Sequence, residues 1–95
     1  MPANGLIFSV HALKRMFERG ISYGDIREVL DKGKVIEEYL NDDPYPSCLM
    51  LGWAGNRPIH IVKAENPEDN QMIIVTVYEP DLLSWEPGFE RRRGQ

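Results

Sequence analysis

The sequence predicts an α+β fold in which two N-terminal helices pack on a curved, mainly antiparallel four-stranded sheet. Three observations support this prediction. Residues 9–32 carry capping residues and apolar positions at helical spacing. From about residue 34 to residue 79 the pattern changes to short apolar runs that are rich in β-branched residues. Only short turns separate these runs, and short turns join antiparallel strands because parallel pairing needs a longer crossover.

The first helix is expected to begin after Ser9, whose hydroxyl can accept a hydrogen bond from an early backbone N–H. Gly20 can adopt the left-handed conformation that ends a helix. His11 and Arg15 are one turn apart and therefore neighbours on one side of this helix. At 100° per residue, four apolar residues share another side and form its expected core face: Val10, Leu13, Met16 and Phe17.

A second helix and four strands are expected to follow. The helix has Ser22 as its N-cap, ends at Gly33 and carries an apolar face of three residues: Ile26, Val29 and Leu30. The strands are expected at residues 35–40, 47–53, 58–64 and 72–78. The last strand is apolar on both of its faces. A central position in the sheet would explain this, as would a second face covered by residues 82–85 or by a partner. We expect that the sheet face away from the helices is not freely solvated.

Length and composition indicate one domain over residues 1–95, with a C-terminal segment at 80–95. The hydrophobic fraction of 42% is ordinary for a globular chain. No apolar run approaches the ~20 residues that span a bilayer, and the N-terminus lacks the pattern of a signal peptide. Cys48 is the only cysteine and cannot form an internal disulfide. Together these features predict a cytoplasmic protein.

The net charge of −4 is distributed unevenly along the chain. Residues 1–35 hold six Lys or Arg against four acidic residues, and residues 36–90 hold two against eleven. The run Arg91–Arg93 adds three positive charges. This distribution argues against a general nucleic-acid coat protein, whose affinity rests on many phosphate contacts. It permits a local anion site on the first helix or at the C-terminus.

Five residues are candidates for a catalytic site: His11, Arg15, Arg19, His60 and Tyr78. Histidine can act as general base or acid near neutral pH, and arginine can stabilise charge on a phosphate oxygen. Tyrosine can orient a substrate or stack on a base. Together these side chains suit metal-free RNA cleavage, in which a 2′-hydroxyl attacks the adjacent phosphate.

Each candidate also has a structural interpretation. His11 or Arg15 can pair with Glu18, His60 can be hydrogen-bonded within the sheet, and Tyr78 can serve packing alone. No metal site or cofactor is expected, because the sequence has no cysteine cluster, no His-x-x-x-His and no Gly-rich phosphate loop.

Several parts of the sequence carry a family resemblance: Phe8-Ser9-x-His11-Ala12-x-x-Arg15-Met16-x-x-Arg19-Gly20-Ile21-Ser22, Gly33-x-Val35-Ile36-Glu37, Asp43-Pro44-x-Pro46-Ser47, Gly52, Arg57-Pro58-Ile59-His60-Ile61-Val62 and Thr76-Val77-Tyr78-Glu79-Pro80-Asp81. They resemble a bacterial family known as domain of unknown function 4258. In its order of two helices followed by a sheet, the chain is also remotely similar to the RelE/ParE-like toxins, especially the BrnT type.

The toxin similarity implies a small endoribonuclease of a toxin-antitoxin system, acting on free RNA or on the ribosome and neutralised by an antitoxin protein. It implies a site formed by His11, Arg15 and Arg19 of the first helix with His60 and Tyr78 of the sheet. The alternative is a non-catalytic protein-interaction module, or a homo-oligomer, whose sheet face binds a partner or a second copy. The sequence pI of about 5.1 and the doubly apolar last strand favour this alternative.

Overall fold

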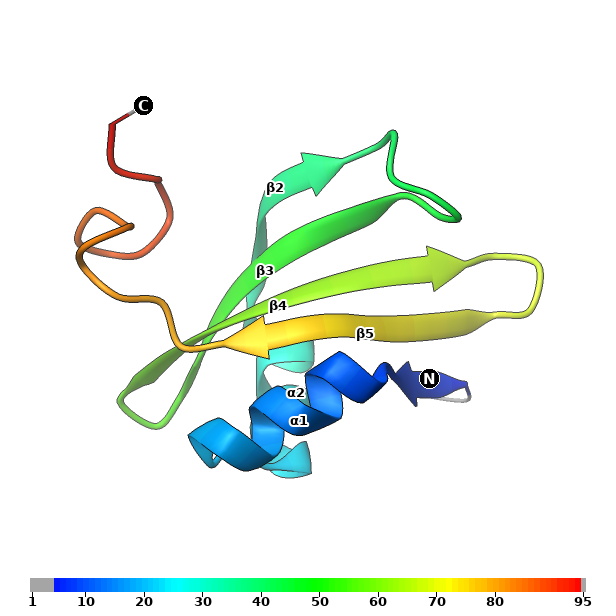
Figure 1. Ribbon diagram of the computed structural model, residues 1–95, viewed down its shortest axis with the longest axis horizontal. Coiled ribbons are helices and arrows are strands. Elements are labelled where there is room, and N and C mark those ends of the chain that lie inside the picture. Colours follow the sequence, from blue (N-terminus) through cyan, green and yellow to red (C-terminus); the bar gives the residue numbers. More distant parts are fainter. Residues whose placement is uncertain (1–4, 95) are drawn as a thin grey trace.

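The computed structural model describes residues 5–94 and contains two helices and one five-stranded sheet (Figure 1). Both helices lie on one face of the sheet, with α1 against β5 and α2 against β3. The sheet is curved, and its strands lie in the order β1-β5-β4-β3-β2. In chain order the elements are β1 (Leu6–Phe8), α1 (Val10–Arg19), α2 (Tyr23–Lys32), β2 (Lys34–Tyr39), β3 (Ser47–Ala54), β4 (Arg57–Asn66) and β5 (Gln71–Tyr78). The α+β class with two helices is confirmed.

The prediction of four mainly antiparallel strands is wrong in one respect, because a fifth strand makes the sheet mixed. Strand β1 pairs in parallel with β5, and Leu6 lies opposite Met72 while Phe8 lies opposite Ile74. The other three pairings are antiparallel, as expected. Three residues are too few to show an alternating pattern, and the partner strand lies at the other end of the domain. The sequence around β1 therefore carried no signal for it.

The ends of both helices are formed as predicted. The Ser9 hydroxyl accepts from the backbone N–H of Ala12 at 2.9 Å, and Gly20 is left-handed with φ of 64°. The Ser22 hydroxyl accepts from the N–H of Asp25, whose carboxylate accepts in turn from the N–H of Ser22. Each cap satisfies backbone N–H groups that have no partner inside the helix.

The predicted core face of α1 is wrong. Val10 is 83% exposed, Leu13 50% and Phe17 90%, although all three were expected in the core. The residue of α1 that is fully buried is Ala12, and Met16 packs partly buried beside it. The apolar stripe of α1, defined here as Val10, Leu13 and Phe17, therefore faces outward.

Contacts at the start of α1 explain its rotation. The backbone N–H of Ser9 donates to the carbonyl of Ile74 at 3.0 Å, and the Ser9 hydroxyl donates to the carbonyl of Val75 at 2.8 Å. These two bonds tie the first turn to β5. Ala12 lies on the side that this attachment turns toward the sheet, and its small side chain allows a close approach of the helix.

The core lies between the helices and the sheet. Its buried members come from both layers: Ala12, Ile21, Ile26, Val29, Ile59, Ile61, Ile74 and Val77. Gly52 of β3 permits the close approach of α2, because a Cβ there would lie 2.8 Å from a methyl carbon of Val29. Within residues 5–94, neither helix is long and apolar enough to cross a membrane.

The opposite face of the sheet is covered in part by the C-terminal arm, defined here as residues 79–94. The arm leaves the end of β5 and folds back on the side away from the helices (Figure 1). Trp85 is its anchor, because this side chain is only 3% exposed. The expectation that residues 82–85 cover this face is thus confirmed for Trp85, whereas Leu82 and Leu83 are exposed.

Candidate functional site

His60 lies in the middle of β4 and is fully buried. Its neighbours Ile59 and Ile61 belong to the core between the helices and the sheet. Because side chains alternate along a strand, His60 points to the opposite face, beneath the C-terminal arm. Tyr78 of β5 is its direct cross-strand partner. Two of the five predicted site residues are therefore neighbours.

Both ring nitrogens of His60 have hydrogen-bond partners. Nε2 lies 2.9 Å from the carbonyl oxygen of Phe89, and Nδ1 lies 3.1 Å from the hydroxyl of Tyr78. A carbonyl can only accept, so Nε2 carries the proton and Nδ1 of the neutral ring accepts from Tyr78. The ring also packs edge to face on Trp85, with their centroids 4.5 Å apart. Every polar atom of the imidazole is satisfied inside the protein.

Burial sets the protonation state of this pair. It lowers the pKa of His60 and raises the pKa of Tyr78, because in both cases the charged form would lose its hydration. His60 is therefore neutral at pH 7 and Tyr78 keeps its proton. The ring of His60 is fully buried, so a ligand could reach it only after the C-terminal arm had moved.

Arg92 fastens the far end of the arm. Its guanidinium donates two hydrogen bonds to the carboxylate of Glu37 on β2, at 3.0 and 3.1 Å, and stacks on Trp85 at 4.7 Å from the ring centroid. These bonds hold the pKa of Glu37 below its usual value. Burial and a hydrogen bond to Glu37 raise the pKa of Tyr39 to about 12. The arm is thus joined to the sheet by a connected set of polar side chains.

The other three predicted residues lie on α1, in the layer on the opposite side of the sheet. His11 and Arg19 are exposed and Arg15 is half-buried. The carbonyls of Arg19 and Gly20 accept from the guanidinium of Arg57 at 2.8 and 2.9 Å, which closes the end of the helix. The sheet therefore separates His11, Arg15 and Arg19 from the pair under the arm. The five residues do not converge on one site.

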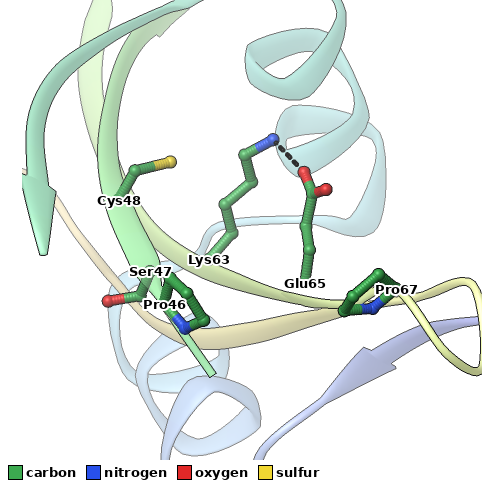
Figure 2. A pocket seen from close by; sticks show the side chains of 6 residues that line it. All are labelled: Pro46, Ser47, Cys48, Lys63, Glu65 and Pro67. Atoms are coloured by element: carbon green, nitrogen blue, oxygen red, sulfur yellow. Dashed lines mark hydrogen bonds and ion pairs between the residues drawn. The ribbon is translucent and has the colours of Figure 1, made fainter. Parts of the chain in front are cut away.

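A pocket of about 300 Å³ lies at one end of β3 and β4 (Figure 2). The ammonium of Lys63 lies 3.1 Å from the carboxylate of Glu65, two residues further along β4. Burial raises the pKa of Cys48, so the thiol in this pocket stays protonated. The pocket therefore offers neither an unpaired cation at Lys63 nor a thiolate at Cys48. The described part of the chain also contains no group of three or more His, Cys, Asp or Glu able to hold a metal ion.

Two features of functional interest were absent from the sequence prediction. Glu37 and Arg92 are 55 positions apart, so no local pattern could pair them. The exposure of the apolar stripe follows from how Ser9 attaches α1 to a distant strand. The amphipathic pattern correctly indicated that α1 has an apolar side, but it could not give the direction in which that side points.

Comparison with known proteins identifies the family. No curated protein and no solved structure matches the chain. The family model described as Domain of unknown function (DUF4258) matches residues 8–79, which include both helices, strands β2 to β5 and all five predicted site residues. This match covers most of the chain. The protein belongs to the DUF4258 family.

Proposed function

We propose that this protein is a non-catalytic interaction module that binds a partner protein through α1. The observation that carries the proposal is the exposure of the apolar stripe, with Val10 at 83%, Leu13 at 50% and Phe17 at 90%. Single exposed apolar residues are ordinary on protein surfaces. A contiguous group on one helix face is a common mark of an interaction site.

The energetic argument favours a protein partner. Burying a leucine, valine or phenylalanine side chain is worth about 1.5–3 kcal/mol relative to leaving it exposed. Three such side chains side by side can therefore supply a substantial part of a micromolar affinity, which corresponds to about 8 kcal/mol. In the isolated protein these three side chains lie in water while Ala12 faces the core, so their burial does not contribute to stability. A partner that covers them would gain this free energy.

The helix also presents these side chains rigidly. The Ser9 cap and its bonds to β5 fix the first turn, and the guanidinium of Arg57 fixes the last carbonyls. A surface ordered before binding loses less conformational entropy when it binds. This supports α1 as the part of the molecule that meets the partner.

Affinity capture from lysate of the native host tests this proposal. The wild type is compared with the double variant Leu13→Ser, Phe17→Ser and with the control Leu83→Ser. Leu83 is as exposed as Phe17 at 90%, but it lies on the C-terminal arm. We expect a protein that is retained by the wild type and the control and lost from the double variant. If all three retain the same proteins, α1 is not the binding surface.

The second candidate is the metal-independent endoribonuclease of a toxin-antitoxin system. Its support is the position of His11 and Arg15 one turn apart on α1, outside the core, together with the resemblance to RelE/BrnT-like toxins. The pair His60 and Tyr78 would take part only with the arm displaced. Growth of a bacterial host is measured after induction of the wild type and of the His11→Ala, Arg15→Ala variant. Arrest and RNA cleavage by the wild type alone would favour this function.

A further inference from the structure

We infer that this protein dimerises by exchanging its C-terminal arm, so that the arm of each copy binds the sheet of the other. The surface that receives the arm is called here the arm-binding surface and is defined by five sheet residues that contact the arm: Lys34, Glu37, Tyr39, Trp53 and His60. The arm lies on the side of the sheet away from α1 (Figure 1), so this inference does not depend on the proposed function.

The arm is held together by contacts within itself. Its two halves run antiparallel, and Trp85 on one half is bridged to Arg92 on the other. The backbone N–H of Arg93 donates to the carbonyl of Ser84 at 2.9 Å. The guanidinium of Arg92 also stacks on the ring of Trp85, 4.7 Å from its centroid. Because these contacts lie inside the arm, they are kept when the arm moves as one piece.

A short link joins the arm to the end of β5. The carboxylate of Glu79 accepts from the guanidinium of Arg57 at 3.2 and 3.3 Å, which fixes the chain at this point. Asp81 already belongs to the first turn of the arm, because its carboxylate accepts from the backbone N–H groups of residues 83 and 84. Rotation of the backbone between Pro80 and Asp81 therefore redirects the arm without disturbing either end.

The contacts that hold the arm on the sheet can form between two chains as well as within one. The imidazole of His60 donates to the carbonyl of Phe89, and the ring of Trp85 packs against the same imidazole. The ring of Phe89 lies edge to face with Trp53, with their centroids 6.1 Å apart. Each contact joins the arm to β3 or β4 through side chains or a single carbonyl. Exchange with a second copy re-forms all of them.

Two ion pairs of opposite polarity favour the arm of a second copy as the occupant of this surface. Glu37 of the sheet pairs with Arg92 of the arm, and Lys34 of the sheet pairs with Glu90 of the arm. A segment that fits must carry an acidic residue two positions before an arginine, together with an aromatic anchor. The arm of a second copy meets all these requirements. A segment with another charge pattern would leave one of the two sheet charges unpaired or opposite a like charge.

Closure within one chain competes with exchange between two chains. A short link keeps the arm beside its own sheet at an effective concentration on the order of millimolar. The wild type is therefore expected to be monomeric at micromolar concentration and to form dimers as its concentration approaches the millimolar range. A change that disfavours closure within the chain shifts this balance toward exchange.

A complementary pair of charge reversals tests the inference. In Glu37→Arg the sheet repels its own Arg92, and in Arg92→Glu the arm repels its own Glu37. When the two variants are mixed, the unchanged arm meets the unchanged sheet and the reversed arm meets the reversed sheet, so a heterodimer restores both pairs. Native mass spectrometry is performed at a concentration at which the wild type is monomeric. We expect at least about ten times more heterodimer in the mixture than homodimer in either variant alone.

A single chain with both reversals is the matched control. Glu37→Arg combined with Arg92→Glu restores the pair within one chain, so this double variant should be monomeric. In a Trp53→Phe background, acrylamide quenching reports whether Trp85 is seated on a sheet. Quenching should be higher than in the wild type in each single variant and should return to the wild-type level in their mixture.

A second pair of reversals repeats the test at more exposed positions. The side chains of Lys34 and Glu90 are 59% and 47% exposed, so Lys34→Glu and Glu90→Lys leave the core intact. Their mixture should also form a heterodimer, in a smaller amount because exposed ion pairs are weaker. Circular dichroism confirms that each variant is folded.

The other outcomes would overturn the inference. Absence of heterodimer from both mixtures, or equal amounts of homodimer and heterodimer, would show that the arm does not exchange. A heterodimer that is lost on adding Leu13→Ser and Phe17→Ser would place the interface on α1 instead. Capture of a different protein by Arg92→Glu, but not by Glu37→Arg, without any heterodimer would replace the second copy by that protein.

Discussion

His60 joins three parts of the molecule through one imidazole ring. One nitrogen donates to the carbonyl of Phe89 in the C-terminal arm, the other accepts from Tyr78 in β5, and the ring packs against Trp85. A histidine with both nitrogens engaged inside the fold acts as a structural link between sheet and arm. The link is sensitive to pH, because only the neutral ring can accept the hydrogen bond from the Tyr78 hydroxyl and because burial disfavours the charged ring.

We predict that stability falls as the pH drops below about 6.5. Burial lowers the pKa of His60 in the folded protein below its ordinary value of 6.5. The unfolded chain then binds more protons than the folded one, so stability is full above 6.5 and is lost below it, by at most ~1.4 kcal/mol per pH unit. Glu37 has a lowered pKa as well, and its contribution is lost only below its ordinary value of 4.5.

Urea unfolding at several pH values between about 7.5 and 5 measures this effect. The variant His60→Gln keeps a donor and an acceptor in similar places but does not titrate, so its stability should vary less over this range. The variant His11→Gln, changed at an exposed position, should behave like the wild type. An equal pH dependence in His60→Gln and wild type would contradict the prediction.

Some features of the helices depend on residues close in sequence, and others depend on residues far away in sequence. The ends of both helices depend on residues within three positions of each other, such as Ser22 and Asp25, and these ends were predicted correctly. The rotation of α1 depends on bonds from Ser9 to residues 74 and 75, and the rotation predicted from the sequence was wrong. Periodicity gives the relative positions of side chains around a helix. It does not give the side that the rest of the chain will cover.

Ser9 is therefore predicted to matter more than an ordinary helix cap. Ser9→Ala removes both the acceptor for the N–H of Ala12 and the donor to the carbonyl of Val75. We expect a loss of about 1–2 kcal/mol in the free energy of unfolding, at the upper end for caps. Urea unfolding measures it. Ser84→Ala, at an exposed position on the C-terminal arm, should cost much less, and equal losses would argue against the role of Ser9.

The C-terminal arm is predicted to loosen when Arg92 is removed. Arg92→Ala loses two hydrogen bonds to Glu37 and the contact with the ring of Trp85. Because these side chains are partly exposed, we expect a loss of only about 1 kcal/mol. In a Trp53→Phe background, Trp85 is the only tryptophan, and its fluorescence should become more accessible to acrylamide.

Arg91→Ala is the matched control for this prediction. Arg91 is more exposed, and its guanidinium lies 3.8 Å from the carboxylate of Glu86 within the same arm. Quenching of Trp85 should stay at the wild-type level in this variant. Equal quenching in Arg91→Ala and Arg92→Ala would show that Arg92 does not fasten the arm.

At the scale of the whole molecule, stability and recognition are expected to reside on opposite sides of α1. On the core side, Ala12 belongs to the same buried cluster as Ile61, and the apolar stripe faces water. Ile61→Ala should lower the free energy of unfolding by about 2–5 kcal/mol, whereas Phe17→Ala should change it by less than about 0.5 kcal/mol. Urea unfolding compares them. A large loss in Phe17→Ala would place that side chain in the core.

The candidate site was predictable only in its parts. The sequence could predict that His60 and Tyr78 lie on adjacent strands, because short turns fix the order of the strands. Their enclosure depends on Phe89 and Trp85, which belong to a segment without regular secondary structure. Sequence spacing also could not reveal that His11 and His60 lie on opposite sides of the sheet, since that depends on how the helical layer packs.

The position of β5 has a consequence for the order in which the chain can fold during synthesis. Both β1 and α1 attach to β5, which ends at Tyr78, whereas α2 packs on β3, which ends at Ala54. In a nascent chain, α2 can therefore pack on the hairpin of β2 and β3 while α1 still has no strand to bind. Strand β1 and helix α1 are made before β5 but can reach their place only after it. Until β5 leaves the ribosome, both apolar sides of α1 are open to any nearby binding protein.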